Sequence, residues 1–402
     1  MISGRFLWQL SWVPLGTIGF VTNALGEEAE DSEKIATTLS VGGYAKLDVL
    51  VSKYRDGEIA PDSLQRDMHF PSQIPVGGHN HIVSDLRFHA RESRFYLSTT
   101  TKFRNDEELY SYVELDFMLS DQGNELISNS YTPRMRHFYF TYDALLLGQT
   151  WSTFMFSDLL VDDLDFIGTA DGVLFVRQPQ IRFSWKGLKV ALENPKVTWD
   201  EASGERVTNE LGSLPDAVLK YDHGGKFGSL SGALIARQLK VQYLADDGAA
   251  DSKSAFGFGA SLGGRTDFWR NDDFRYQFTV GSGLGRYAAL NFANAAFVDN
   301  EQRISPRMSY LGFVGIRHFW SACWRSNVNI SGIHVDNNGG SQYLNRRAAS
   351  ASVNLLFSPL KPLTFGAEFM RGYRQIENGD SGVFDRVQLS AIYHFDYTTP
   401  SF

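Results

Sequence analysis

The segment 384–395, FDRVQLSAIYHF, constrains the fold of this chain more than any other stretch of the sequence. Side chains of a β-strand point alternately to its two faces, so this segment predicts a strand of about ten residues with one apolar and one polar face. The pattern recurs in weaker form along most of the chain. One face carries Val387, Leu389, Ala391, Tyr393 and Phe395, and the other carries Arg386, Gln388, Ser390 and His394, with Ile392 as the one interruption.

Composition fits a β-barrel whose two faces meet different solvents. The chain is 14% aromatic, contains 37 glycines and has a mean hydropathy of -0.24. No segment after the N-terminus approaches the run of roughly 20 apolar residues that a membrane-spanning helix needs. Alternating hydrophobicity in an aromatic-rich and glycine-rich chain is typical of a transmembrane barrel. A soluble β-sandwich also alternates and is the competing interpretation.

The N-terminus predicts export. Arg5 precedes the apolar stretch 6–21, and Ala24 ends a run of small residues, so 1–24 is interpreted as a secretory signal peptide. A short membrane anchor is the alternative, disfavoured by Pro14 and by the glycines of the stretch. Segment 25–38 is polar and is expected to be a short periplasmic N-terminal segment. The expected destination is the bacterial outer membrane, after Sec-type export through the periplasm.

Charge and cysteine content narrow the possibilities further. The formal net charge is -8, and a net acidic exported protein is no candidate for general nucleic-acid binding. Cys323 is the only cysteine of the sequence, so no internal disulfide can form.

Residues 39–395 divide into sixteen expected strands, joined by eight longer connections and seven short turns. Long loops on one rim and short turns on the other are typical of an outer-membrane barrel. Merging two weak strands would give fourteen. A sixteen-stranded antiparallel barrel is wide enough to leave an aqueous channel. The expected strands are 39–53, 91–102, 109–119, 134–142, 145–150, 173–185, 188–197, 217–222, 227–243, 255–268, 274–288, 309–320, 324–335, 348–359, 363–374 and 383–395, and a tail, 396–402, follows.

Enzyme signatures are poor. The GSGLG run at 281–285 lies within a strand pattern with no helix after it, which argues against a phosphate-binding loop. His79 and His81, with His69 and His89 nearby, lack a third closely spaced ligand in an extracellular-type loop, so solvated histidines are favoured over a metal site. The sequence contains no HExxH, and its GxSxG match, GASLG at 259–263, lies inside the expected strand 255–268, so it is no nucleophile elbow. We therefore expect no catalytic residue, no metal and no cofactor.

Residues 91–195 contain a collinear series of motifs: RESRF (91–95), YVELDF (112–117), NSYTPRMRHFYF (129–140), LLLGQTWSTF (145–154), LDF (164–166), RQPQIRF (177–183) and LENP (192–195). In this order and spacing they resemble the core signature of the DcaP-like trimeric outer-membrane porin family. The resemblance implies a homotrimer in outer-membrane lipid that admits small organic anions, dicarboxylates and aromatic carboxylates among them. It also implies that 151–172 folds into the barrel as a constriction loop.

The chain departs from the family pattern at both ends. Family members often carry a coiled-coil segment after the signal peptide, and here only a short acidic stretch stands there. The tail DYTTPSF follows the last expected strand, whereas barrel proteins commonly end on that strand's aromatic residue.

Arginine is the expected pore-lining residue, since the chain has 26 arginines against 12 lysines. A guanidinium keeps its charge and can hold a carboxylate through two parallel hydrogen bonds. Pro179 permits a bulge that would turn both Arg177 and Arg182 inward. A salt bridge at the rim or at a subunit interface is the alternative for each. The candidates are Arg94, Arg134, Arg136, Arg177 and Arg182.

The constriction loop carries the opposite charge. Asp158, Asp162, Asp163 and Asp165 would set a transverse field across the gap if they face the arginines. Capping turns or pairing with arginines to hold the loop is the alternative. Lys46, Asp48, Glu114 and Asp116 are weaker lining candidates. A barrel hydrolase and a plugged structural or adhesive barrel are the competing functions.

Overall fold

The computed structural model describes residues 34–103, 107–118, 123–124, 128–209, 212–244, 250–269 and 271–401. The expected signal peptide lies outside these residues. Within the described ranges no helix has the length and apolarity that a transmembrane helix requires.

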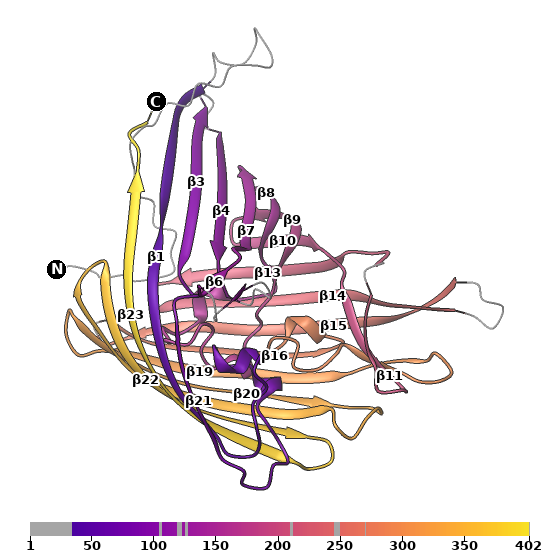
Figure 1. The fold of residues 1–402 in the computed structure, drawn as a ribbon. Helices are drawn as coiled ribbons and strands as arrows, with labels where there is room; N and C mark the ends of the chain where they lie inside the picture. The colour runs from indigo at the N-terminus through magenta and orange to yellow at the C-terminus, as the bar shows by residue number, and fades with distance from the viewer. Residues whose placement is uncertain are drawn as a thin grey trace.

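The chain forms a closed, sixteen-stranded antiparallel barrel (Figure 1), which confirms the expected fold class. Each strand pairs with the next along the chain, and the last strand pairs with the first to close the wall. The strands are β1 (Lys34–Tyr54), β3 (Arg94–Phe103), β4 (Glu108–Asp116), β7 (Arg134–Tyr142), β8 (Leu145–Trp151), β9 (Arg177–Trp185), β10 (Leu188–Glu193), β13 (Asp216–Gly225), β14 (Gly228–Leu244), β15 (Ala250–Phe268), β16 (Asp272–Ser282), β19 (Met308–Phe319), β20 (Trp324–Asp336), β21 (Asn345–Leu360), β22 (Leu363–Ile376) and β23 (Ser381–Thr398).

The two faces of the wall differ as the alternation predicts. On β23, Leu389 is 50% exposed and its neighbour Gln388 is 3% exposed. On β16, Phe278 is 58% exposed and Gln277 is 1% exposed. Apolar side chains thus point outward and polar side chains inward, the reverse of a soluble protein and the arrangement that a lipid-embedded barrel needs.

The closing seam is longer than the sequence pattern suggested. β1 begins at Lys34, inside the segment expected to be a polar lead-in, and β23 continues to Thr398, inside the expected tail. The two overhanging ends pair with each other, since Thr398 lies opposite Ser40, and the backbone N–H of Thr399 donates to the carbonyl of Leu39 at 3.0 Å. Backbone hydrogen bonds between the two ends therefore extend both strands past the residues in which apolar and polar side chains alternate.

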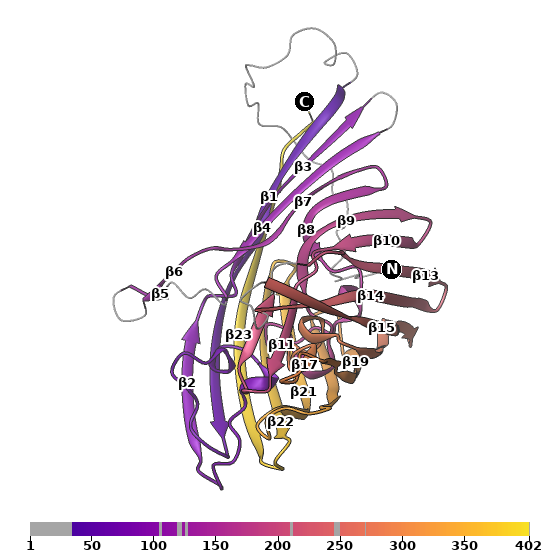
Figure 2. The same ribbon diagram turned by 90° about the vertical axis from the view of Figure 1, so that its right-hand side faces the viewer.

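Several short elements form inside connections that were expected to be loops (Figure 2). β2 pairs with the second half of β1, so β1 faces β3 along its first half and β2 along its second. β11 and β17 lie in different connections and pair in parallel within a four-stranded sheet. These elements are β2 (Val83–His89), β5 (Gly123–Asn124), β6 (Ser130–Tyr131), β11 (Val197–Glu201), β12 (Arg206–Asn209), β17 (Ala296–Val298) and β18 (Ile304–Pro306), with the 3₁₀ turns η1 (Leu64–Arg66), η2 (Pro71–Gln73), η3 (Ser157–Leu159) and η4 (Ala170–Gly172).

Three expected strands are too long. The strand expected at 274–288 ends at Ser282, and the 3₁₀ turn η5 (Gly285–Tyr287) follows it. The strand expected at 173–185 begins only at Arg177, and the one expected at 188–197 ends at Glu193. The apolar residues beyond these ends pack into the interior as parts of connections.

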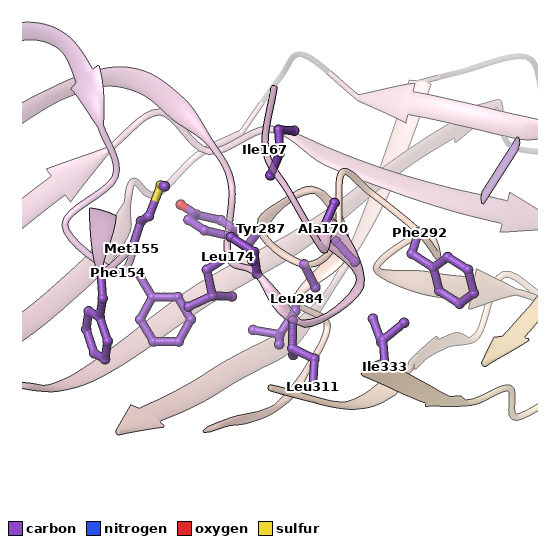
Figure 3. Packing of buried hydrophobic residues seen from close by; sticks show 14 of the residues in the cluster. Phe154, Met155, Ile167, Ala170, Leu174, Leu284, Tyr287, Phe292, Leu311 and Ile333 are labelled. Atoms are coloured by element: carbon purple, nitrogen blue, oxygen red, sulfur yellow. The ribbon is translucent and has the colours of Figure 1, made fainter. Parts of the chain in front are cut away.

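A hydrophobic core fills part of the barrel interior (Figure 3). Its members come from four connections, those between β1 and β3, β4 and β7, β8 and β9, and β16 and β19, and from inward positions of the wall. Met68, Met118, Phe154 and Phe292, one from each connection, are at most 1% exposed. The loops are therefore packed against one another inside the wall.

Candidate pore lining and constriction

The connection between β8 and β9, which we call loop 3 (residues 152–176), starts on a buried carboxylate. Glu193, the last residue of β10, accepts a hydrogen bond from the backbone N–H of Thr153 at 2.7 Å and another from the hydroxyl of Ser152 at 2.8 Å. Glu193 is 1% exposed. The glutamate of the LENP motif thus fixes the point where the chain leaves the wall and enters the lumen.

The middle of loop 3 is held by its backbone. Glu368 on β22 accepts from the N–H of Leu164 at 2.7 Å and from the N–H of Asp165 at 3.2 Å. The carbonyl of Leu164 accepts from Gln388 at 2.9 Å and from Lys46. Lys46 also pairs with Asp48 at 3.4 Å, so these two weaker lining candidates belong to the support of the loop.

Three of the four loop aspartates contact the wall. Asp162 pairs with Arg317 at 3.3 Å and with Arg325 at 3.2 Å. Asp163 accepts from Asn329 and from Ser352, both at 3.0 Å. These contacts have the geometry of loop anchors.

The two anchoring carboxyls have opposite pKa shifts. Burial raises the pKa of Asp163 to about 6, and the nearby Asp165 adds to the rise, although the bonds from Asn329 and Ser352 oppose it. Burial also acts to raise the pKa of Asp162, but Arg317 and Arg325 outweigh it and lower that pKa below its ordinary value. Asp158, in contrast, is exposed.

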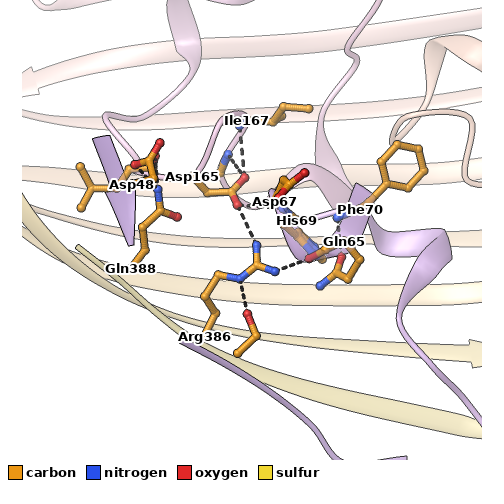
Figure 4. Close-up of polar contacts among 12 residues, drawn as sticks. Asp48, Gln65, Asp67, His69, Phe70, Asp165, Ile167, Arg386 and Gln388 are labelled. Carbon is orange, nitrogen blue, oxygen red and sulfur yellow. Dashed lines mark hydrogen bonds and ion pairs between the residues drawn. The ribbon is translucent and has the colours of Figure 1, made fainter. Parts of the chain in front are cut away.

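The first long connection, which we call loop 1 (residues 55–82), docks on loop 3 (Figure 4). Asp165 accepts from the backbone N–H of His69 at 2.7 Å and pairs with Arg386 of β23 at 3.4 Å. The Nε2 of His69 lies 2.9 Å from a carboxylate oxygen of Asp171. His69 and Asp171 are both 0% exposed. Loop 1 therefore lies inside the barrel, against the constriction.

The arginine candidates fall into two groups, and the first is paired with carboxylates. Arg134 binds Asp116 through two hydrogen bonds of 2.9 and 2.7 Å. Arg136 binds Asp116 at 2.7 Å and also Glu114, and the Nε of Arg94 lies 3.7 Å from Glu114. Glu114 and Asp116 thus contact three arginines, and Arg94 also interacts electrostatically with Glu92, so this part of the inner wall is densely charged with both signs.

Arg177 and Arg182 form the second group. No described residue forms a salt bridge with either of them. The guanidinium of Arg177 lies 4.4 Å from the ring centre of Trp151, directly opposite it on β8, and 5.7 Å from that of Phe175. On β9, Arg182 lies between the outward-facing Ile181 and Phe183, so alternation turns it inward.

The bulge considered at Pro179 does not form. The register between β8 and β9 is continuous from Leu145 opposite Phe183 to Trp151 opposite Arg177, and Pro179 is exposed on the outer face. Arg177 is the first residue of β9, next to the end of loop 3. Its guanidinium stacks on Trp151 and lies close enough to that of Arg136 for the two positive charges to repel each other, which places it inside the barrel.

A bulge does form one hairpin earlier, on β7. The register to β4 shifts between Glu114 and Leu115, and both Arg136 and its neighbour His137 are buried. His137 bonds to the Thr150 hydroxyl at 2.9 Å. The sequence carries a signal for this bulge, because the polar even positions 134 and 136 give way to aromatic residues at 138, 140 and 142. A change of phase within one strand is what an inserted residue produces.

Sequence reasoning also missed a group of tyrosines on the inner face of β3, β4 and β7. Only their position between outward-facing apolar residues could have indicated them. They are Tyr96, Tyr110, Tyr112 and Tyr139, all half-buried.

A sixteen-stranded barrel with an apolar outer surface, a charged inner wall and an inward-folded loop is the architecture of an outer-membrane porin. The family model described as DcaP outer membrane protein matches residues 63–395. The chain therefore belongs to the DcaP family and resides in the bacterial outer membrane.

Solved structures agree on the fold. The outer membrane channel DcaP of Acinetobacter baumannii is 21% identical, with a TM-score of 0.73 over 92% of this chain and 100% of that one. The trimer form of OmpT from Vibrio cholerae is 9% identical, with a TM-score of 0.54 over 90% and 100%. An anion-selective porin from Comamonas acidovorans is 10% identical, with a TM-score of 0.50 over 89% and 100%. No curated protein sequence matches the chain.

Proposed function

We propose that this barrel is a passive diffusion channel for small organic anions, dicarboxylates and aromatic carboxylates among them. The observation that carries the proposal is the pair Arg177 and Arg182, which form no salt bridge with a described residue: alternation turns Arg182 inward, and Arg177 stacks on Trp151 near Arg136. Arg94, Arg134 and Arg136 lie on the same part of the inner wall, where they contact Glu114 and Asp116. When a carboxylate enters this region, guanidinium N–H donors replace part of its hydration water. Each site binds the carboxylate only weakly, so the solute can leave again.

Three further elements belong to the proposal. Among the aspartates of loop 3, Asp158 is exposed and interacts electrostatically with Lys220 of β13, and it is proposed to contribute to a transverse field. Asp162 and Asp163 contact the wall at β19, β20 and β21 instead. The functional unit is proposed to be a homotrimer, which is supported by the trimer form of the V. cholerae relative. Anion preference is supported by the name of the C. acidovorans porin.

The proposal predicts the sign of the reversal potential in a planar bilayer. With a KCl gradient across the membrane, the wild-type channel should prefer chloride over potassium. The double variant Arg177→Ala, Arg182→Ala should lower the anion-to-cation permeability ratio roughly twofold or more, because two fixed positive charges leave a narrow aqueous gap. Arg303→Ala is the matched control, since Arg303 pairs with Asp299 on the surface. A wild-type channel that prefers cations would contradict the proposal.

A plugged structural barrel is the second candidate, and the hydrophobic core inside the lumen favours it. The loops that form this core occupy space that a wide pore would leave to water. The same bilayer experiment separates the two candidates: a steady closed trace from correctly folded protein supports the plugged barrel, and discrete current steps support the channel.

A further inference from the structure

We propose that Tyr96, Tyr110, Tyr112 and Tyr139 form a binding shelf for the ring of ring-bearing carboxylates. The shelf would lie on the inner wall beside Arg182 and would retain a solute by its ring while a guanidinium holds its carboxylate. The inference rests on the proposed function, because it assigns a second subsite to the same anion path.

The strand register turns all four rings into the lumen. Tyr112 lies opposite Ser98 on β3 and opposite Tyr139 on β7, and Tyr96 lies opposite the buried Glu114. The residues between them point outward and are exposed to different degrees: Phe95, Leu97, Phe138 and Phe140 are 50%, 43%, 58% and 43% exposed.

The rings contact one another across three strands. The ring centres of Tyr96 and Tyr112 are 5.6 Å apart, and the ring planes are inclined by 24°. Tyr110 and Tyr112 are 6.3 Å apart at 19°, and Tyr139 lies 5.8 Å from Tyr112 and 6.2 Å from Tyr110. The result is one continuous aromatic surface rather than four isolated side chains.

This surface is not part of the hydrophobic core. The core is built from loops 1 and 3, the connections before β7 and β19 and other parts of the wall, and none of the four tyrosines belongs to it. Tyr96 lies over Gly42 of β1, where an added Cβ would come within 2.6 Å of the tyrosine oxygen. The ring therefore packs against the wall through a gap that glycine provides, and the four half-buried rings keep part of their surface open to the lumen.

Cations stand at both ends of the aromatic surface. Through His137, 6.0 Å from Tyr112 and 5.4 Å from Trp151, the ring contacts continue to the tryptophan on which Arg177 stacks. At the other end Arg182 interacts electrostatically with Tyr139. Five residues of extended strand place the two arginine Cα atoms about 16 Å apart. A carboxylate can thus be held at either end while its ring lies on tyrosine.

Stacking of a flat ring on an aromatic face adds binding free energy to that of the carboxylate–guanidinium interaction. Aromatic pairs in offset or edge geometry gain enough beyond area burial to change affinity roughly three- to tenfold. An aliphatic dicarboxylate has the charge but no ring, so it would gain little from the shelf. The shelf should therefore separate solutes of like charge by shape.

The test measures block of the chloride current by added acids, with the full-length protein in a planar bilayer. The acids are benzoate, cyclohexanecarboxylate, glucuronate and, as the ringless reference, succinate. In the double variant Tyr110→Leu, Tyr139→Leu, the benzoate concentration that halves the current should rise roughly three- to tenfold. The value for succinate should stay within about a factor of two. Tyr110→Phe, Tyr139→Phe keeps the rings and should retain benzoate block.

Tyr393→Leu, which changes a tyrosine on the outer face, is the matched control and should change nothing. An unaltered chloride conductance shows that each variant has folded, and the single Tyr139→Leu variant serves if the double variant does not. If the half-blocking concentration rises for benzoate alone, the shelf binds planar aromatic rings. If it rises for glucuronate as well, the shelf binds any ring with a flat face. Both results support the shelf. Unchanged block by every ring acid overturns the shelf, whereas absence of anion preference and of succinate block in the wild type overturns the proposed function.

Discussion

Asp163 is the residue through which pH should act on the constriction. Its folded pKa of about 6 exceeds the ordinary value of 3.8 because the carboxyl is buried, so ionisation is costlier in the folded protein. The contribution of neutral Asp163 to the free energy of unfolding is therefore complete below about pH 4, and it is lost as the pH rises through about 6. The loss is at most about 3 kcal/mol. Thermal stability of wild type relative to Asp163→Asn should therefore fall between pH 4 and 7, and a difference that does not vary with pH would contradict this account.

Which face a side chain occupies could be predicted at the residue scale, but its partners could not. Alternation placed Arg136 and Glu114 inside the barrel, yet nothing in the spacing shows that Glu114 and Asp116 hold three arginines between them. The same limit applies to Asp162, which the structure joins to Arg317 and Arg325, more than 150 residues away. A pairing across the lumen depends on strand tilt and loop path, which a single sequence does not encode locally.

At the scale of elements, the existence of all sixteen wall strands could be predicted, because most of them repeat the two-residue period along their length, although some of their ends could not. The short strands in the connections could not. β17 has three residues, and its partner β11 lies in another connection, so neither has a period long enough to detect. The inward course of loop 3 followed from family resemblance, and that of loop 1 had no sequence signal.

Docking of loop 1 on loop 3 can be tested with a single histidine. His69→Ala removes a fully buried ring that contacts Asp171 and leaves that carboxylate short of a partner, which costs roughly 1–3 kcal/mol. Loop 1 should then become accessible to protease added to the folded protein, and the current through single channels should fluctuate more. His79→Ala, at an exposed turn of the same loop, should match wild type. Equal protection of loop 1 in both variants would argue that His69 does not hold it.

For the whole molecule, the inversion of polarity should make the cost of an outward charge depend on depth. Leu389 lies midway along β23 and Tyr397 near its end, on the same outward face, 50% and 60% exposed. Leu389→Arg should lower the free energy of unfolding by about 2–4 kcal/mol, because the guanidinium would face hydrocarbon, whereas Tyr397→Arg should cost about 0–1 kcal/mol near the interface. Guanidinium unfolding in lipid vesicles, followed by tryptophan fluorescence, measures both. Equal costs at the two positions would mean that the outer face of β23 meets a uniform medium, such as a neighbouring subunit along its whole length, instead of a lipid band bounded by water.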